Sequence, residues 1–492
     1  MKAQRNLFKW LGMAFLFATF ISFTFLLPPA FAQEESLETE TPTPSETLLS
    51  PEATPEPLEI PEIESESSFR SFSLQSITKL GGDWAAQVNI SDTVSESLKP
   101  QVAADEFGNL HIVWRETVNG NQEVFYTWIG VDKTTQSLPV NVSNSPSFHS
   151  HAPQIVVDST GIAHIVWQET DSDHGDDYEI HYSNCQTTGN EEDGYISSCS
   201  TNPTILSNGD ACGSFVGDWK STDPSIGIDG NDNLMVAWMS FEPNNRLYTM
   251  FSLWSAFGTP PANRTGCNLA TGSYYYPVVA GDSNGDFHLL RMNASTSIFY
   301  SKYSGGSWSA NQTLGTGWLP VIHVDVNNKL HAAWWNTNAP PKYRSKESTS
   351  STWSSTENVF TSTICAELSL ITDESNLPRL ACANGLVYEA SRQGSSWAES
   401  VIIQSGGSQP DLAKDSSNNL HLVWSDSRSG ILDIFYSPTY SCEGISPTTN
   451  AGIAVLNEIQ NMPFLNYCKN LVEEVIYVPE KMGLKHLKNG LN

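Results

Sequence analysis

The sequence predicts an all-β fold, a seven-bladed β-propeller that is closed by an N-terminal strand and followed by a short, partly helical C-terminal tail. Three observations predict it. One motif recurs seven times along the chain, each copy has the pattern of a four-stranded unit, and the strand that the last copy lacks stands before the first copy. Repetition at about 40–50 residues in β-rich units is typical of propeller blades.

The repeated motif is a Pro, an Asp five residues later, a turn of Gly or Asn, and then His and Trp at three-residue steps. The first copy runs from Pro100 to Trp114 and the second from Pro153 to Trp167. The fifth and seventh copies, with turn aspartates Asp325 and Asp415, keep the whole motif. The third, fourth and sixth are degenerate and are recognised by Asp229, Asp282 and Asp373.

Each copy can be divided into four strands. In the first copy, 101–104 is a short apolar strand, 105–109 is a turn, and 110–115 is a second strand rich in aromatic and β-branched residues. The third strand ends in Tyr, as in 123–126, and the fourth begins near a Trp, as at Trp397.

The last copy stops after its third strand, at Ser437. Residues 84–91, which precede the first copy, have the pattern of a fourth strand. Pairing this segment with the unit built from 410–437 closes the circle and leaves no open strand edge at the join.

The ends of the chain have other compositions. Lys2, Arg5 and Lys9 precede an apolar run that ends before the small-residue site Ala30-Phe-Ala32, as in a secretory signal, although an uncleaved anchor is the alternative. An acidic Pro/Thr/Ser/Glu segment follows, too poor in apolar residues to fold. The predicted organisation is a signal peptide (1–32), a disordered linker (33–74), the propeller (75–441) and a C-terminal tail or cap (442–492).

Charge and cysteines indicate the compartment and the partners. The net charge of −29 argues against nucleic acid and anionic membranes. Eight cysteines in an exported chain indicate disulfides. We expect a secreted or cell-surface monomer with no membrane span in the mature chain. The cysteines expected to pair or to staple loops are Cys365 with Cys382, Cys442 with Cys468, and Cys185, Cys199, Cys212 and Cys267 in long insertions.

The motif 105–114 and the segment 425–437, with Asp433-Ile-Phe-Tyr-Ser, resemble repeats of exported sialidase-like (BNR-related) β-propeller proteins of bacteria. The resemblance covers about three-quarters of the chain and implies the propeller fold. The catalytic motifs of sialidases are not matched: the chain has no Ser-x-Asp-x-Gly-x-Thr-Trp box, no Phe-Arg-Ile-Pro near the start of the repeats and no evident arginine triad. No catalytic residue is therefore assigned.

The repeated His and Trp residues are expected to be structural. A side chain that recurs once per blade satisfies the same local hydrogen bond in each, and symmetry spreads such side chains around the ring. We expect the histidines to bond to their own Asp turns or to a carbonyl, and the tryptophans to pack between blades. The histidines are His111, His164, His288, His331 and His421.

Polar residues occupy the position two residues after each repeat Trp. Glu116, Glu169 and Asp426 come from copies one, two and seven, which become neighbours when the ring closes. With Asn336 and Arg428, they predict an exposed acidic arc that binds a glycan or an extracellular protein. A solvated polar rim without a ligand is the alternative.

A second acidic cluster lies in copy two, between its second and third strands. Close carboxylates repel unless a cation bridges them or they are protonated, so Ca²⁺ is the candidate cofactor, and a solvated turn is the alternative. The candidate metal ligands are Asp171, Asp173, Asp176, Asp177 and Glu179.

Three functions fit these patterns. The first is a non-catalytic binding module for glycan or protein. The second is a carbohydrate-active enzyme, a sialidase-like glycoside hydrolase or polysaccharide lyase, that uses acidic residues on the rim, because adjacent blades about 10 Å apart suit the 6.5–9.5 Å carboxylate spacing of inverting glycosidases. The third is a structural element of the cell surface.

Overall fold

A computed structural model describes residues 69–71, 84–85, 87–133, 135–170, 178–190, 194–207, 220–241, 247–261, 265–268 and 273–439. These residues belong to one compact unit. They form strands and turns only, as an all-β fold predicts. The expected signal segment and the C-terminal tail lie outside the described residues. Within the part described, no helix is long and apolar enough to cross a membrane.

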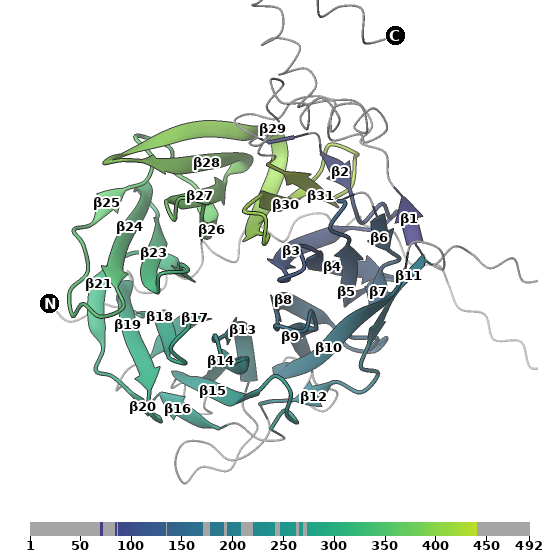
Figure 1. The fold of residues 1–492 in the computed structure, drawn as a ribbon, viewed down its shortest axis with the longest axis horizontal. Helices are drawn as coiled ribbons and strands as arrows, with labels where there is room; N and C mark the ends of the chain where they lie inside the picture. Colours follow the sequence, from purple (N-terminus) through teal and green to yellow (C-terminus); the bar gives the residue numbers. More distant parts are fainter. Residues whose placement is uncertain are drawn as a thin grey trace, which may run out of the picture. The chain divides into compact units, whose positions relative to one another are not determined.

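The strands form six antiparallel sheets (Figure 1). The first sheet contains β1 (Phe69–Ser71), β3 (Ser97–Ala104), β4 (Leu110–Val118), β5 (Asn121–Ile129), β6 (Thr135–Ser137) and β7 (Val140–Asn141). The second contains β8 (Ser150–Val157), β9 (Ala163–Thr170), β10 (Tyr178–Asn190), β11 (Gly194–Cys199) and β12 (Thr204–Ile205). The third contains β13 (Lys220–Ile228), β14 (Asn233–Phe241), β15 (Leu247–Ser255) and β16 (Gly266–Asn268).

The fourth sheet contains β17 (Tyr274–Gly281), β18 (Phe287–Asn293), β19 (Ser297–Ser304), β20 (Ser307–Trp308) and β21 (Gln312–Thr316). The fifth contains β22 (Trp318–Val324), β23 (Lys329–Asn336), β24 (Ala339–Glu347) and β25 (Glu357–Asn358). The sixth contains β26 (Ala366–Thr372), β27 (Pro378–Ala383), β28 (Gly385–Gln393), β29 (Ser396–Lys414), β30 (Leu420–Asp426), β31 (Asp433–Pro438) and β2 (Val88–Asn89).

Two features differ from the sequence-based expectation. Residues 69–71, expected in the disordered linker, form β1 and pair with β6. In addition, the sixth and seventh copies share one sheet. The 19-residue strand β29 pairs with β28 at its start and with β30 at its end, so it is both the outer strand of copy six and the first strand of copy seven.

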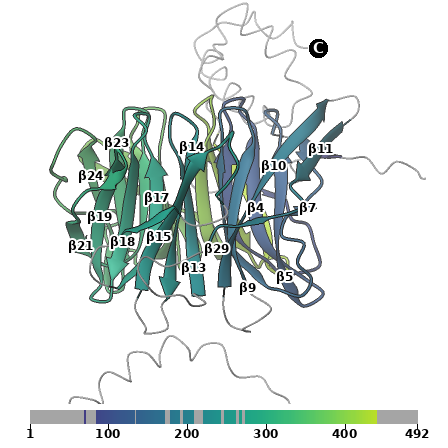
Figure 2. The same ribbon diagram turned by 90° about the horizontal axis from the view of Figure 1, so that it is seen from below.

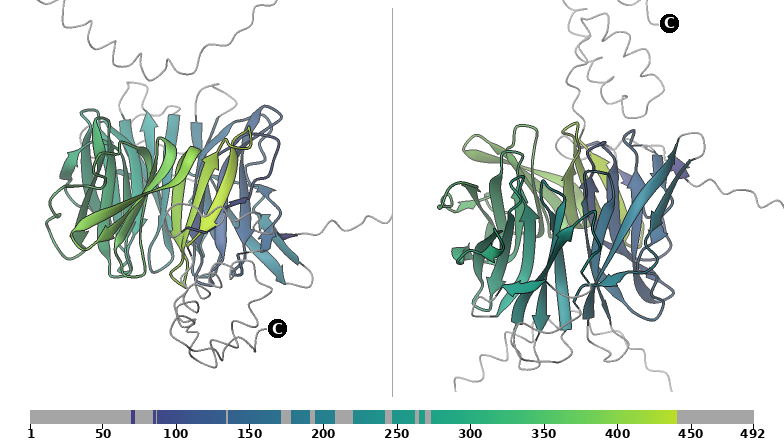
Figure 3. Two further views of the ribbon diagram at one scale, coloured as in Figure 1. Left: turned by 90° about the horizontal axis from the view of Figure 1, so that it is seen from above. Right: turned by 60° about the horizontal axis from the view of Figure 1, so that its bottom comes forward.

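The sheets are arranged around a central axis, and the first strands of the seven copies contact each other in a circular order (Figure 1). That order is β3, β8, β13, β17, β22, β26 and β29, and β29 contacts β3 in turn. From the side, the strands run roughly along this axis (Figure 2), and the last strands lie beside the first sheet (Figure 3).

The N-terminal segment pairs with the last strand. Val88 and Asn89 pair antiparallel with Tyr436 and Phe435, and Trp84 forms an isolated bridge to Thr439. Trp84 is fully buried. This is the pairing that the missing fourth strand predicts.

The core is apolar and lies largely between neighbouring sheets. One buried cluster joins Leu110 and Trp114 of the first sheet to Val423 and Ile434 of the last. The repeat tryptophans at 114, 167, 238, 334 and 424 are at most 1% exposed, which confirms their packing role.

The repeat histidines are buried in one recurring network. In each, Nδ1 lies 2.7–2.9 Å from a tyrosine hydroxyl on the next strand, and Nε2 lies 3.0–3.4 Å from the turn aspartate. Oδ1 of the same aspartate accepts backbone N–H groups of the turn, as Asp158 does from Thr160 and Ile162. The expected bond between histidine and turn is confirmed. Burial lowers the pKa of His421 to about 4, which favours the neutral ring.

Two disulfides are present among the described residues. Cys365 pairs with Cys382 as predicted, and Cys185 pairs with Cys199 across β10 and β11. Both fit an extracellular protein.

Candidate functional site

The structure corrects the prediction of an exposed acidic arc. Glu116 and Glu169 are 6% exposed and Asp426 is fully buried. Each carboxylate accepts the indole N–H of the tryptophan two residues earlier, at 2.8–2.9 Å. The reason is the two-residue period of a strand, which puts both side chains on one face. A buried indole N–H needs an acceptor, and this position supplies it.

Further contacts hold these carboxylates in place. Glu169 also accepts the Ser150 hydroxyl at 2.9 Å. Asp426 accepts the backbone N–H and Nε of Arg428 at 2.9 and 2.7 Å. Burial raises the pKa of Glu116. These acids therefore stabilise the ends of the second strands.

The other two predicted rim residues are accessible. The Arg428 side chain is 33% exposed, and it donates to Gln87. Asn336 is half-buried and accepts the backbone N–H of Asn338 at 3.3 Å. The structure thus retains Arg428 and Asn336 as candidate outer contacts.

The predicted calcium ligands Asp171, Asp173, Asp176 and Asp177 lie outside the described residues. Glu179 is described: it lies on β10 opposite Glu169 and accepts the Ser207 hydroxyl. Within the described ranges, no three His, Cys, Asp or Glu side chains are grouped to hold a metal. The calcium site stays a prediction.

A cavity of about 280 Å³ lies on the central axis, and all seven copies line it. Each copy contributes the residue before the repeat Pro and the one or two residues that follow. In the sixth copy, Leu368 stands in the position of the Pro. We call the seven leading residues the channel ring; they are Lys99, Ala152, Asp223, Tyr276, Leu319, Glu367 and Gln409.

Every residue of the channel ring has a left-handed backbone, with φ between +45° and +57°. At the same place the pairing of each first strand with its second shifts register, for example between Leu98 and Gln101 or between Ser408 and Asp411. A bulge of this kind bends a strand and redirects a side chain. The seven bulges therefore place one side chain from each copy on the cavity.

The side chains of the channel ring differ in chemistry. Oε1 of Gln409 accepts the backbone N–H of Lys99 at 2.8 Å, and Oε2 of Glu367 accepts that of Gln409 at 2.9 Å. Burial raises the pKa of Asp223, against the opposing effect of Lys99. Burial, and then the charge of Asp223, raise the pKa of Tyr276. The ring thus combines a lysine, two carboxyl groups, an amide and a phenol.

A half-buried aspartate lies next to the ring, and its carboxyl links three copies. Asp411 accepts the backbone N–H of Val102 in copy one at 2.9 Å and the Ser369 hydroxyl of copy six at 2.8 Å. Burial raises its pKa to about 6. Asp411 therefore bridges the join between the last copy and the first.

The channel ring was not among the sequence-predicted site residues. The signal that could have indicated it is the position before the repeat Pro, which varies from copy to copy while the Pro itself recurs. Periodicity does not show that this position is bulged, because the bulge is a property of strand pairing.

No protein-family model and no curated protein sequence matches this chain. Similar solved structures include a protein of unknown function from Dyadobacter fermentans, at 9% identity over 75% of this chain and 98% of that one, with a TM-score of 0.45. A Trypanosoma rangeli sialidase in complex with sialic acid is 11% identical over 74% of this chain, with a TM-score of 0.45, and this chain spans 59% of its length. The polysaccharide lyase Uly1 is 10% identical over 69% of this chain and 89% of that one, with a TM-score of 0.45. Identities of this size say nothing of activity.

Proposed function

We propose that this chain is an exported, non-catalytic binding protein, built as a closed seven-bladed β-propeller, that binds a glycan or a segment of an extracellular protein at the channel ring. The circular order of the first strands and the pairing of β2 with β31 support the closed architecture. Two disulfides support export.

The observation that carries the proposal is the absence of glycine from the channel ring. A non-glycine residue at positive φ costs on the order of 1 kcal/mol, and glycine adopts this conformation without strain. All seven positions nevertheless hold residues with side chains. Seven side chains kept at this cost around one cavity indicate that the side chains themselves are used.

The predicted rim residues take two roles in this proposal. Glu116, Glu169 and Asp426 support the rim through their tryptophans. Arg428 and Asn336 are accessible and would contact the parts of a ligand that extend beyond the cavity.

A carbohydrate-active enzyme is the second candidate, and the pair of Asp223 and Tyr276 favours it. Both groups line the cavity and both have raised pKa values. A carboxyl group whose pKa is raised is the usual kind of general acid. In that case Asp223 would donate a proton during hydrolysis or elimination of a bound glycan, and the protein would be an enzyme instead of a binding protein.

One experiment separates the two functions. The chain is screened on a glycan array, and the glycans that bind are then tested for product release. For the binding protein, Lys99→Ala and Tyr276→Phe should weaken binding at least five-fold without any product from the wild type. The control is Lys342→Ala on β24, which should bind as the wild type does. Product release that Asp223→Asn abolishes would show the enzyme, and channel variants that bind normally would exclude this site.

A further inference from the structure

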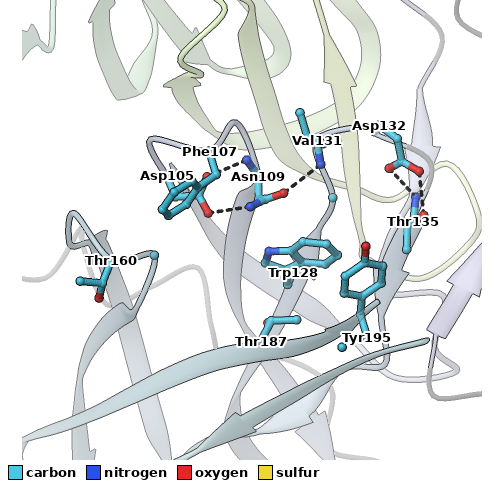
Figure 4. A pocket seen from close by; sticks show the side chains of 13 residues that line it. Asp105, Phe107, Asn109, Trp128, Val131, Asp132, Thr135, Thr160, Thr187 and Tyr195 are labelled. Atoms are coloured by element: carbon cyan, nitrogen blue, oxygen red, sulfur yellow. Dashed lines mark hydrogen bonds between the residues drawn. The ribbon is translucent and has the colours of Figure 1, made fainter. Parts of the chain in front are cut away.

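A second cavity, of about 340 Å³, lies between the first and second copies (Figure 4). Its walls come from the turn 105–109 after β3, the loop that follows β5, the turn 158–162 between β8 and β9, and the hairpin of β10 and β11. Its volume is at the small end of the range of roughly 300–1,000 Å³ that is usual for ligand pockets.

This cavity is separate from the channel ring. Strand β3 has Lys99 near its start, whereas the turn that lines this cavity follows its end at Ala104. No residue lines both cavities. An inference about this site is therefore independent of the proposed function.

Three aromatic side chains from three elements line the cavity (Figure 4). Phe107 is 61% exposed on its turn. Trp128 of β5 and Tyr195 of β11 have ring centroids 4.7 Å apart. Phe107 is a large apolar side chain exposed at the cavity, and covering it with an apolar surface is favourable.

Polar groups surround these aromatic rings. Thr160 and Thr187 bring hydroxyl groups, and Asn109 and Asp132 bring amide and carboxylate oxygens. Several are already held in place: Oδ1 of Asn109 accepts the backbone N–H of Val131 at 3.0 Å, and Oδ1 of Asp132 accepts that of Thr135 at 3.0 Å. A few fixed polar groups around an apolar surface are the usual composition of a small-molecule site.

The outer wall of the cavity is also fixed. The disulfide between Cys185 and Cys199 joins β10 to β11, the strands that carry Thr187 and Tyr195. Oγ1 of Thr187 lies 2.8 Å from the hydroxyl of Ser197. A wall with this support is preorganised, which lowers the cost of binding.

The charges in the cavity select against anions. The acidic side chains of its lining are Asp105 and Asp132, and the lining holds no Lys, Arg or His. Lys133, next in sequence, is 7% exposed; its Nζ donates to the carbonyl of Gly108 and lies 3.4 Å from Asp415. The nearest lysine is thus already paired, and an anionic ligand would meet negative charge.

We infer that this cavity binds one neutral monosaccharide unit. A pyranose has an apolar face of C–H groups and a rim of hydroxyl groups, which match the aromatic rings and the surrounding oxygens. It carries no negative charge, so the acidic lining does not repel it. The ligand is thus a neutral hexose or the neutral end unit of a glycan, and sialic and uronic acids are excluded.

The test uses the full chain and defined probes. Saturation-transfer NMR and calorimetric titration are run with methyl glucoside, methyl galactoside and methyl mannoside, and with N-acetylneuraminic acid and glucuronic acid as anionic probes. We expect at least one neutral glycoside to bind and both acids to fail.

Variants then locate the site. Phe107→Ala should weaken binding of the neutral glycoside at least five-fold, and Thr160→Val should weaken it at least two-fold. Phe257→Ala is the matched control, because Phe257 is 63% exposed and lies outside this cavity.

Three results would overturn the inference. They are a failure of all three neutral glycosides to bind, equal binding by the Phe107→Ala and wild-type chains when circular dichroism shows both folded, and binding of the acids as tight as that of the neutral sugars.

Discussion

Replacing Glu169 by alanine should destabilise the fold. The carboxylate is buried and accepts two hydrogen bonds, from the indole of Trp167 and from the hydroxyl of Ser150. A hydrogen bond to a charged group contributes about 1.5–3 kcal/mol, and a buried donor that loses its acceptor keeps its desolvation cost. The loss of both bonds should therefore cost about 3 kcal/mol.

That free energy converts into a measurable change in melting temperature. The entropy of unfolding is about 2.1 cal/mol/K per residue, so a folded unit of about 370 residues loses about 0.8 kcal/mol per degree near its midpoint. A cost of about 3 kcal/mol then corresponds to a decrease of roughly 4 °C in Tm, measured by calorimetry at one scan rate.

Two further variants test the reasoning behind this value. Glu169→Gln keeps one acceptor oxygen and should cost about 1 kcal/mol. Glu106→Ala removes an exposed glutamate of a turn and should leave the Tm within a degree. A Glu169→Ala chain that melts with the wild type would refute the structural role, and the acid would return as a candidate ligand contact.

The remaining predictions concern the join, the pH response and a disulfide. Trp84→Ala removes a fully buried indole that donates to Glu389 at 2.8 Å, and it should cost about 4 kcal/mol, or roughly 5 °C in Tm; an unchanged Tm would contradict a closed ring. The pKa of Asp411 is about 6 in the fold and near 4 when unfolded, so the folded state holds the extra proton, and stability should fall by about 2 kcal/mol as pH rises from 4 to 6. Asp411→Asn should lose that part of the pH dependence, and identical Tm profiles at pH 4, 5 and 6 would show that Asp411 does not contribute. Replacing Cys365 and Cys382 together by serine should cost about 3 kcal/mol, which chemical denaturation checks, and a variant of unchanged midpoint would show that the bridge does not constrain the unfolded chain.

The sequence predicted the structural features that depend on residues close together in the chain. The Asp turn, the buried His and the packed Trp follow from one repeated motif, as in 105–114, and Trp84 was recognised because it stands where other fourth strands begin. The disulfide between Cys365 and Cys382 followed from the hairpin between them.

Features that depend on pairing between strands could not be predicted in this way. Glutamate is a residue type that is usually exposed, so the sequence indicated a rim position for Glu169. Its burial involves a hydrogen bond from Ser150 on the adjacent strand, which the sequence does not show. The left-handed conformation at Leu319 or Tyr276 arises where two strands pair out of register, and no residue type marks it. Continuity of β29 through Gly407 likewise depends on its partners on both sides.

The join between the two ends of the fold has a mechanical consequence. Strand β2 has only two residues and is antiparallel to β31, so tension on the N-terminal side of Trp84 would pull its hydrogen bonds apart one after another. Within this join, Trp84 is the first residue to bear the load, and its indole is bonded to Glu389 in the sixth copy. Copies six and seven share β29. Tension that reaches Trp84 would therefore be passed to two copies before the join opens.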